Sequence, residues 1–363
     1  MHVAEIFLKD WRNIAEMNFC PDAATNIFLG RNAQGKTNIL EAINFASLLR
    51  SRAGKESELI RWGKDTALVR IKFFKAGISH DLAIEISAER RRRIFLDANP
   101  IRPRELVGKL NSVLFSPEDL FMFKGSPIGR RKFLDAQISQ ASPIYFFDLL
   151  KYNRIVEQRN VLLKKIRDGS ANIEELDLWD EQLAFAAEKV LSKRLSSVSK
   201  LNILANFMHK KISAQSENLS VVYEMRGLNS EKNIAEKFFD LLRIKRAEDV
   251  RSGSTGKGPH RDDLRFFINE RELKLFGSQG QLRTATLALK LSALQFLKSE
   301  TGEYPLLLLD DVMSELDVER REMLLEFLGY EKIQTLITAT DRAYFPPQSF
   351  GKFFFIKTGT LTE

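Results

Sequence analysis

The sequence is poor in the residues that build disulfides and soft-metal sites. Its 363 residues include one cysteine, Cys20, so the chain can form neither an internal disulfide nor a multi-cysteine metal centre. The four histidines are scattered and show no spacing typical of metal ligands. Because disulfides are rare in reducing compartments, their absence suits a cytoplasmic protein. A disulfide scaffold and a cysteine-rich zinc module are therefore excluded.

Long hydrophobic runs are also missing. The longest apolar stretches, such as Leu306–Leu309, fall far short of the roughly 20 residues that a membrane span needs. The N-terminus mixes charged and apolar residues and lacks the apolar segment of a signal peptide. We find no internal repeat and no low-complexity tract. We therefore expect a soluble, cytoplasmic protein with no membrane partner.

Positive charge is in mild excess. The chain has 56 Lys and Arg against 48 Asp and Glu, a formal net charge of +8. This excess permits a polyanionic partner, but a well-solvated basic surface would explain it equally well. Apolar residues make up 44% of the chain, which is enough for a sizeable core, and the length fits two domains.

Hydrophobic periodicity predicts an α/β head that is split by a helical insertion. The head would occupy residues 1–115 and 256–363, and the mainly helical part residues 116–255. Ser126-Pro127 and Ser142-Pro143 each indicate a helix start, because proline fits the first helical position after a serine cap. The segment Arg251–Lys257 has the composition of a flexible linker.

The predicted strands are short and mostly apolar, and several are bounded by turn residues. They are Val3–Phe7, Ala24–Leu29, Ala67–Phe74, Asp81–Ser87, Arg91–Ala98, Leu219–Met225, Leu264–Ile268, Glu272–Leu275, Leu306–Leu309, Gln334–Thr338 and Lys352–Ile356. Helical spacing predicts helices over Asn38–Arg50, Pro143–Ile166, Glu174–Ile212, Glu231–Arg246 and Val318–Leu328, and a long helix from Ser278.

A phosphate-binding loop is indicated between the second predicted strand and the first helix, where the sequence matches G-x-x-x-x-G-K-[ST]. Glycines let such a loop turn its N–H groups toward phosphate oxygens, and a helix N-terminus attracts anions. We expect Lys36 to reach the β- and γ-phosphates of ATP, and the Thr37 hydroxyl to bind Mg²⁺. The strand–loop–helix context disfavours the alternative, a chance glycine turn. The nucleotide-binding residues would be Gly30, Arg31, Asn32, Ala33, Gln34, Gly35, Lys36 and Thr37.

A Walker B strand is predicted at Leu306–Leu309. Its unbroken apolar run is typical of a parallel strand buried on both faces. Asp310 would lie at the carboxyl end of this strand and hold Mg²⁺. The alternative is a core strand capped by acidic turn residues, which becomes less favoured once the phosphate-binding loop is considered.

The segment Ser278–Gln281 resembles the signature of ABC ATPases, whose core is S-x-G-Q. A serine hydroxyl, bare N–H groups and a helix dipole together form a second anion-binding end. In that family this end faces the γ-phosphate held by the other subunit, which implies roles in trans for Ser278, Gly280 and Gln281. The alternative is an ordinary serine-capped helix. The position of Ser278, 32 residues before Asp310, matches the order of ABC heads.

Three further positions bear on the rate of hydrolysis. Ser314–Asp317 resembles the D-loop of ABC ATPases, which implies that Asp317 reaches across a dimer, although a helix cap is an alternative role. Asp311 stands where ABC ATPases usually carry a glutamate, so Asp311, with Lys36, is the catalytic candidate and would orient the attacking water. Thr340 stands where transporter ATPases carry a histidine. These departures favour a weak ATPase and disfavour a transporter subunit.

Segments along nearly the whole chain resemble the RecF family of DNA-repair ABC proteins. They are Ala33–Asn38, Leu40–Ile43, Glu58–Gly63, Phe115–Leu120, Lys124–Pro127, Arg130–Asp135, Gly258–Leu264 and Ser278–Gln281. The resemblance implies an ABC-type P-loop head with a mixed sheet core, an antiparallel β subdomain and a short helical arm. The 242 residues between Lys36 and Ser278 are too few for the long coiled coils of SMC-type proteins.

The same resemblance implies how the protein works. It implies an ATP- and Mg²⁺-dependent homodimer that binds double-stranded or single-strand-gapped DNA without sequence specificity. It also implies help in loading recombinase together with other recombination-mediator proteins, and a weak DNA-stimulated ATPase. A non-catalytic ATP-binding DNA scaffold remains the alternative.

Three basic clusters could contact DNA phosphates, although each could equally be a solvated face. They are Arg90–Arg93 in a predicted strand pair, Arg50 and Arg52 after the first helix, and Lys164, Lys165 and Arg167. Alternation along a strand would place only half of the arginine run on one face. No base-reading motif and no aromatic stripe is apparent, so we expect DNA binding that ignores sequence.

Overall fold

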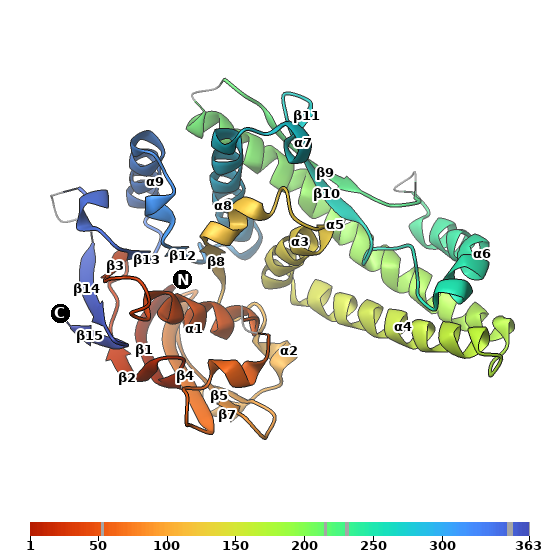
Figure 1. Ribbon diagram of the computed structural model, residues 1–363, viewed down its shortest axis with the longest axis horizontal. Helices are drawn as coiled ribbons and strands as arrows, with labels where there is room; N and C mark the ends of the chain where they lie inside the picture. The colour runs from red at the N-terminus through yellow and green to blue at the C-terminus, as the bar shows by residue number, and fades with distance from the viewer. Residues whose placement is uncertain (52–53, 214–215, 229–231, 347–350, 363) are drawn as a thin grey trace. The chain divides into compact units, whose positions relative to one another are not determined.

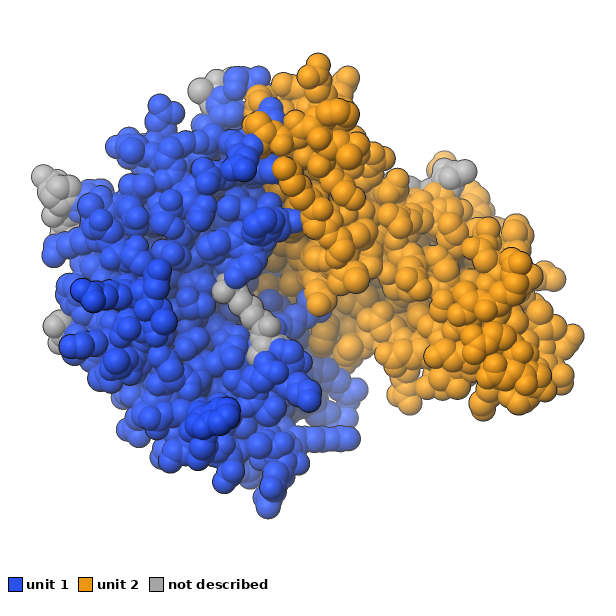
Figure 2. All heavy atoms as spheres, in the orientation of Figure 1, with its two compact units in different colours: residues 1–121, 208–216, 279–363 blue, residues 122–207, 217–278 orange. Residues whose placement is uncertain are grey.

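The computed structural model describes residues 1–51, 54–213, 216–228, 232–346 and 351–362. The chain forms two compact units, which Figure 2 shows in different colours. Unit 1 comprises Met1–Phe121, Met208–Ser216 and Gln279–Glu363, and unit 2 comprises Met122–Phe207 and Glu217–Ser278. Residues 256–278, which the sequence analysis assigned to the head, thus lie in unit 2. The reason is that the strand at Asp263–Ile268 pairs with the one at Leu219–Glu224.

Unit 1 contains two six-stranded sheets (Figure 1). The first is antiparallel throughout, in the order β2 (Ile14–Phe19), β1 (His2–Trp11), β4 (Thr66–Lys75), β5 (Ile78–Ser87), β6 (Arg93–Leu96) and β7 (Asn99–Pro100). The second is mixed, in the order β15 (Thr360–Thr362), β14 (Lys352–Lys357), β3 (Thr25–Leu29), β13 (Thr335–Ala339), β12 (Leu306–Asp310) and β8 (Ser112–Phe115). Among the described strands of the second sheet, only β15 pairs antiparallel. The antiparallel subdomain and the mixed core sheet expected from the sequence are both confirmed.

Helix α1 (Lys36–Leu48) joins the two sheets of unit 1, because it contacts β1 and β4 of one and β8, β12 and β13 of the other. Its buried apolar residues share one continuous core with both sheets. The strands β3, β12 and β13 are buried at every position, as expected for central parallel strands. The other helices of unit 1 are α2 (Pro103–Leu106), α8 (Gln279–Thr301) and α9 (Val318–Glu331).

Unit 2 is built from long helices and one small sheet. The helices are α3 (Pro127–Ala141), α4 (Pro143–Arg167), α5 (Leu176–Ile212, whose last turn belongs to unit 1), α6 (Ile234–Ser252) and α7 (Leu273–Phe276). The sheet has the order β11 (Arg271–Glu272), β10 (Asp263–Ile268) and β9 (Leu219–Glu224). Helices α3 and α4 begin at Pro127 and Pro143 after Ser126 and Ser142, as predicted.

Three local predictions were wrong. The strand predicted over Glu272–Leu275 is helix α7, because the ladder with β10 ends after two residue pairs and Gly277 N–H then bonds Leu273 O. The strand predicted from Arg91 begins at Arg93. Segment Arg251–Lys257 is not a flexible linker, because α6 continues to Ser252 and the buried Thr255 is hydrogen-bonded to helix α4. Strands β2, β7, β8 and β15 were not predicted.

Candidate nucleotide-binding site

The loop between β3 and α1 depends on two glycines. A Cβ at Gly30 would lie 2.4 Å from the carbonyl oxygen of Ile356, so this position admits no side chain. Gly35 has φ of 104°, in the left-handed region, and a Cβ there would lie 2.6 Å from the side-chain oxygen of Asn13. The motif thus has glycine at two positions where the loop backbone lies against a neighbouring segment, Gly30 against Ile356 and Gly35 against Asn13.

Neighbouring segments brace this loop. Gln34 accepts a hydrogen bond from Gly359 N–H at its carbonyl (2.9 Å) and one from Thr358 N–H at Oε1 (2.7 Å). On the other side, the Asn38 amide donates to Asn13 Oδ1 at 2.8 Å. Both contacts join residues that are far apart in the sequence, and both fix the loop geometry. Gln34 and Asn38 therefore have structural partners as well as a place in the pocket lining.

Lys36 is the first residue of α1 and is buried. Its ammonium group donates to the carbonyl oxygens of Gly30 (2.6 Å) and Arg31 (2.9 Å), which hold it across the loop. Burial lowers the pKa of Lys36, and the nearby carboxylates of Asp311 and Asp310 oppose that shift. The ammonium is thus partly desolvated, and within the described part of the chain its hydrogen bonds go only to neutral carbonyls. An anion would be a stronger partner.

Thr37 and the predicted Walker B aspartate meet directly. The hydroxyl of Thr37 donates to Asp310 Oδ1 at 2.8 Å, and Thr338 Oγ1 donates to the same oxygen at 2.9 Å. Thr338 in turn accepts a hydrogen bond from the Asp311 backbone N–H at 2.9 Å. This cluster brings α1, β12 and β13 to one edge of the mixed sheet. It places hydroxyl and carboxylate oxygens, the ligands that Mg²⁺ prefers, side by side.

Asp311 has the least satisfied carboxylate of this cluster. Its φ of 52° turns the chain out of β12, and its Oδ1 is buried without a hydrogen-bond partner among the described residues. Burial raises the pKa of Asp311, whereas Lys36 lowers it and Asp310 raises it further. A buried polar oxygen without a partner is costly, so this atom marks a place where a ligand or water would bind.

These residues surround a pocket of about 280 Å³ in unit 1. Its lining consists of Asn32, Ala33, Gln34, Gly35, Lys36, Thr37, Asn38, Asp311 and Thr338. The lining thus contains Asn32–Thr37 and Asp311 of the predicted site. Asp310 contacts Thr37 but, like Gly30 and Arg31, is not part of the lining. Gly280, Gln281 and Asp317 do not line this pocket.

The residues expected to act in trans lie at exposed helix starts. Ser278 ends unit 2, and the exposed Gln279 and Gly280 open α8 in unit 1. Asp317 caps α9, because its Oδ1 accepts the Arg320 N–H at 3.0 Å, and it also pairs with the Arg320 guanidinium. The alternative role weighed for Asp317, that of a helix cap, is thus present in the structure.

Sequence reasoning missed Thr338 as a member of the site. The sequence drew attention to Thr340, which is exposed after β13. Thr338 lies opposite Asp310 in the parallel pairing of β12 and β13, so its role depends on strand register. Only the pairing of these two strands could have revealed it.

The basic clusters differ in their partners. Arg90 and Arg91 lie exposed in the turn between β5 and β6, and within the described residues their side chains have no hydrogen-bond or ion-pair partner. Arg93 pairs with Glu85 at 2.6 Å, and Arg167 with Asp168 at 3.2 Å. Arg52 lies outside the described residues. Arg90, Arg91 and Arg92 therefore lie between the strands, and Arg93 alone of the arginine run belongs to a strand.

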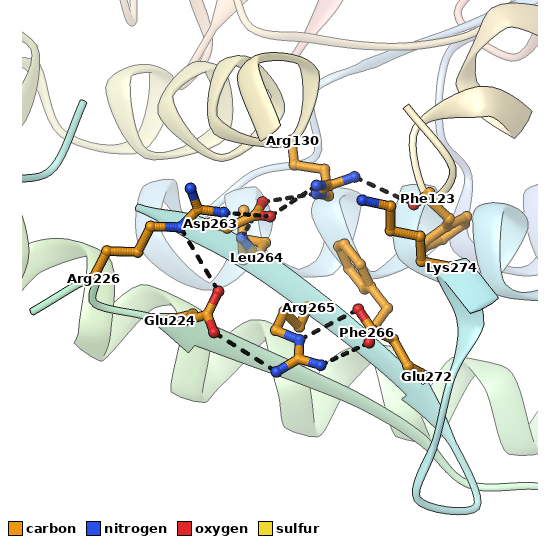
Figure 3. Close-up of a pocket in the computed structure, with 10 residues that line it drawn as sticks. All are labelled: Phe123, Arg130, Glu224, Arg226, Asp263, Leu264, Arg265, Phe266, Glu272 and Lys274. Carbon is orange, nitrogen blue, oxygen red and sulfur yellow. Dashed lines mark hydrogen bonds and ion pairs between the residues drawn. The ribbon is translucent and has the colours of Figure 1, made fainter. Parts of the chain in front are cut away.

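A second pocket, of about 180 Å³, lies in unit 2 and contains seven charged side chains (Figure 3). Arg130 forms two 2.8 Å hydrogen bonds to Asp263 and also donates to three backbone carbonyls. Arg265 pairs with Glu272 at 2.6 Å and with Glu224 at 3.6 Å. Most of the charged side chains in this pocket thus neutralise one another without a ligand.

The described residues contain neither a metal-binding cluster nor a membrane-spanning helix. No group of three or more His, Cys, Asp or Glu side chains is placed to hold a metal ion there. None of the helices described is both long and apolar enough to cross a membrane.

Comparison with known proteins gives consistent results. The family model of the RecF/RecN/SMC N-terminal domain matches residues 2–349. "DNA replication and repair protein RecF" of Halothermothrix orenii is 42% identical over 94% of this chain and 92% of its own length. The protein of the same name from Clostridium novyi is 37% identical over 100% of both chains.

Solved structures are similar as well. One described as the recombination mediator protein RecF-ATP in the RecFOR pathway has a TM-score of 0.92 and 36% identity, covering 99% of this chain and 97% of the other. The corresponding RecF-ATPrS structure has a TM-score of 0.91 with the same identity and coverage. An Smc head domain from Pyrococcus furiosus has a TM-score of 0.57 at 14% identity, covering 99% of this chain and 95% of the other, and shows the shared fold alone.

Proposed function

The chain belongs to the RecF/RecN/SMC family, and from that premise we propose that it is an ATP-dependent DNA-binding protein of recombinational repair and replication-fork maintenance. The contact of Thr37 with Asp310, beside the glycine loop and Lys36, carries the proposal. Relatives named as DNA replication and repair proteins, and a RecF structure described with ATP, support it.

The residues of the pocket fit ATP and Mg²⁺. Lys36 holds an ammonium that two neutral carbonyls satisfy and that an anion would satisfy better. Thr37 and Asp310 supply hard oxygen ligands for a divalent cation. When bound, Mg²⁺–ATP supplies the negative phosphate oxygens and the hydrolysable γ-phosphate. Asp311, with its unpartnered Oδ1, would orient the attacking water.

ATP would act as a dimerisation switch in this proposal. Ser278, Gly280, Gln281 and Asp317 would meet the γ-phosphate held by a second copy, as the ABC resemblance implies. The exposed start of α8 supports this, because its N–H groups and dipole favour an anion. An aspartate at 311 is one methylene shorter than the usual glutamate, so we expect slow hydrolysis that is stimulated by DNA and resets the switch.

DNA would be bound without reading its sequence, near single-strand gaps, where the dimer helps to load recombinase with other mediator proteins. The net charge of +8 and the exposed Arg90 and Arg91 support contacts to the phosphate backbone. The alternative is a non-catalytic scaffold, which the shorter acid at 311 and the threonine at 340 would suit.

Lys36→Ala tests the nucleotide site. Losing a charge-assisted contact worth about 3 kcal/mol lowers ATP affinity about 100-fold. Calorimetric ATP titration measures this, with Lys245→Ala, a half-buried lysine in α6 of unit 2, as the control. Gapped-duplex binding with ATP should fall in parallel. Unchanged DNA binding and no DNA-stimulated turnover by the wild type would favour the scaffold.

Asp317→Asn and Asp317→Ala separate dimerisation from capping. Asparagine caps helices as well as aspartate, whereas alanine costs about 1 kcal/mol of unfolding free energy. We expect only the alanine variant to lose stability and both variants to sediment as weaker ATP-dependent dimers. Full ATP-dependent dimerisation of Asp317→Asn would leave Asp317 as a cap alone. The dimerisation switch would be contradicted if the ATP-loaded wild type stayed monomeric at micromolar concentration and the Ser278→Arg variant sedimented in the same way.

A further inference from the structure

Trp62 is the most exposed large hydrophobic side chain of the described residues, with 98% of its surface accessible. An indole in water leaves a large apolar surface unburied, which is a cost that folding normally avoids. The other two tryptophans of the chain are buried or half-buried. Trp62 therefore needs an explanation that folding of the monomer does not give.

Hydrogen bonds anchor the turn that carries Trp62 to the rest of unit 1. Lys64 N–H bonds Arg61 O at 3.0 Å, and Gly63 has φ of 77°, which places Trp62 at the first central position of a type II turn. Arg61 N–H donates to Asp10 O of β1 at 2.8 Å, and Ile60 is bridged to Trp11. The indole is thus presented on an anchored support and not on a loose loop.

The surroundings of Trp62 are cationic and not apolar. Its neighbours in the turn are Arg61, Gly63 and Lys64. The turn after β5 is tied to the same region, because Ala88 N–H bonds Asp65 O at 3.0 Å and Arg92 pairs with Glu56. Segments 54–65 and 88–93 together hold seven Lys and Arg against four Asp and Glu. We name these two segments the Trp62 surface.

An isolated aromatic among cations fits a nucleic acid better than a protein. Protein interfaces surround their aromatic anchors with an apolar core, which the Trp62 surface lacks. Single-stranded DNA is bound by cations that follow its backbone and by aromatic rings on which bases stack. Bases inside a duplex already stack on each other, so a single ring gains most by stacking on an unpaired base.

We propose that Trp62 stacks on an exposed base at the junction between duplex and single-stranded DNA, while Arg90, Arg91 and Lys64 contact the adjacent phosphates. This inference rests on the proposed function and deepens it, because it assigns gap recognition to one side chain. A single stacking ring marks one base position, whereas coating a strand would need a series of rings. Recognition would thus be of the junction and not of the sequence.

The test measures binding of ATP-loaded protein to gapped duplex and to flush-ended duplex of the same length by fluorescence anisotropy. Loss of one stacked base costs about 5- to 100-fold in affinity. Trp62→Ala should show this loss on gapped DNA and much less on flush duplex, and Trp62→Phe should keep most of the affinity. Ile78→Ala, at the other end of the β4–β5 pair and 62% exposed, is the control and should bind like the wild type.

An abasic substitution at the unpaired position next to the junction gives the specific readout. Wild-type affinity should fall to that of Trp62→Ala, and the variant should not respond to the missing base. Quenching of tryptophan fluorescence by gapped DNA should also disappear in Trp62→Phe. Arg90→Ala with Arg91→Ala should reduce the salt dependence of binding without changing the response to the abasic site.

The failures can be told apart. Equal DNA binding by wild type and Trp62→Ala on every substrate would overturn the inference and leave the proposed function intact. A loss of dimerisation or of mediator-protein binding in Trp62→Ala, with unchanged DNA affinity, would assign the ring to a protein contact and also overturn it. Absence of any DNA binding by the wild type would overturn both proposals.

Discussion

Charged groups in the nucleotide pocket of unit 1 are satisfied differently from those in the interior of unit 2. In the pocket, Lys36 meets only neutral carbonyls, and one oxygen of Asp311 has no hydrogen-bond partner among the described residues. In unit 2, the fully buried Arg159 pairs with Asp180 at 2.6 Å and with Asp249 at 2.7 Å, and its Nη2 has no hydrogen-bond partner among the described residues. The first arrangement leaves interactions for a ligand, and the second leaves few.

This contrast shows why pairing matters more than charge density in identifying a binding site. The pocket of Figure 3 holds more ionic groups than the nucleotide pocket, yet Arg130 is fully used by Asp263 and three carbonyls. Buried ion pairs contribute little net stability but are costly to break. Removing a charged side chain should therefore destabilise the protein when the charge lies in unit 2. It should stabilise the nucleotide-free protein when the charge is the unpartnered carboxylate of the nucleotide pocket.

Arg159→Ala should have the largest effect on stability. It removes one ion-pair partner from each of two buried carboxylates, Asp249 and Asp180, of which Asp180 keeps Arg246, and this costs about 3–5 kcal/mol of unfolding free energy. Urea unfolding measures the loss. Arg167→Ala removes an exposed pair with Asp168 and should change stability by less than about 0.5 kcal/mol. Equal stability of the two variants would contradict the contrast.

His260 and Asp262 should produce opposite responses to pH. Burial lowers the pKa of His260 from 6.5 to about 4, so its contribution is complete above pH 6.5 and is lost as pH falls toward 4. Burial raises the pKa of Asp262 from 3.8 to about 6, so its ionisation destabilises above pH 6, and stability is regained as pH falls toward 3.8. Each shift corresponds to about 3 kcal/mol. The wild type should therefore show a shallow dependence between pH 6 and 4.

Single variants separate the two groups. In Asp262→Asn only His260 titrates, so the free energy of unfolding should fall steeply as pH falls from 6.5 to 4. In His260→Asn only Asp262 titrates, so the free energy of unfolding should rise as pH falls from 6 to 3.8. Urea unfolding at half-unit pH steps measures both slopes. Slopes of the same sign in the two variants would contradict the opposed pKa shifts.

Asp311→Asn should have the smallest effect, and in the opposite direction to Arg159→Ala. Because burial raises the pKa of Asp311, its ionised form destabilises the nucleotide-free protein at neutral pH. The variant should be the more stable protein at pH 7, and its advantage should vanish as pH falls to the ordinary value of 3.8. Thermal unfolding without nucleotide measures this, and a destabilised variant would show that the carboxylate has partners in solution.

Features that depend on local sequence were predicted well. The glycine loop, Lys36 and Thr37 follow from a motif in its strand–loop–helix context, and the helix starts at Pro127 and Pro143 follow from backbone chemistry. Asp310 was found from the apolar run that precedes it. In each case the residues that determine the feature lie within a few positions of one another.

Features that depend on pairing between distant segments were not predicted. Thr338 enters the site through the register of β12 and β13, and the hydrogen bonds to Gln34 come from residues 358 and 359. The polar Arg251–Lys257 segment resembles a linker, yet Thr255 is buried against Arg159 and Asn160. Its composition carries no sign of the buried partner that orders it.

The position of β3 in the mixed sheet has a consequence for synthesis on the ribosome. Both of its neighbours, β13 and β14, come from residues 335–357, and the turn that braces Gln34 follows them. The strand that leads into the phosphate-binding loop therefore has no partner strand until those residues are translated. Unit 2 is complete at residue 278. Unit 2 can therefore fold first during translation. A product that stalled after residue 278 would carry a folded unit 2 but an unformed ATP site.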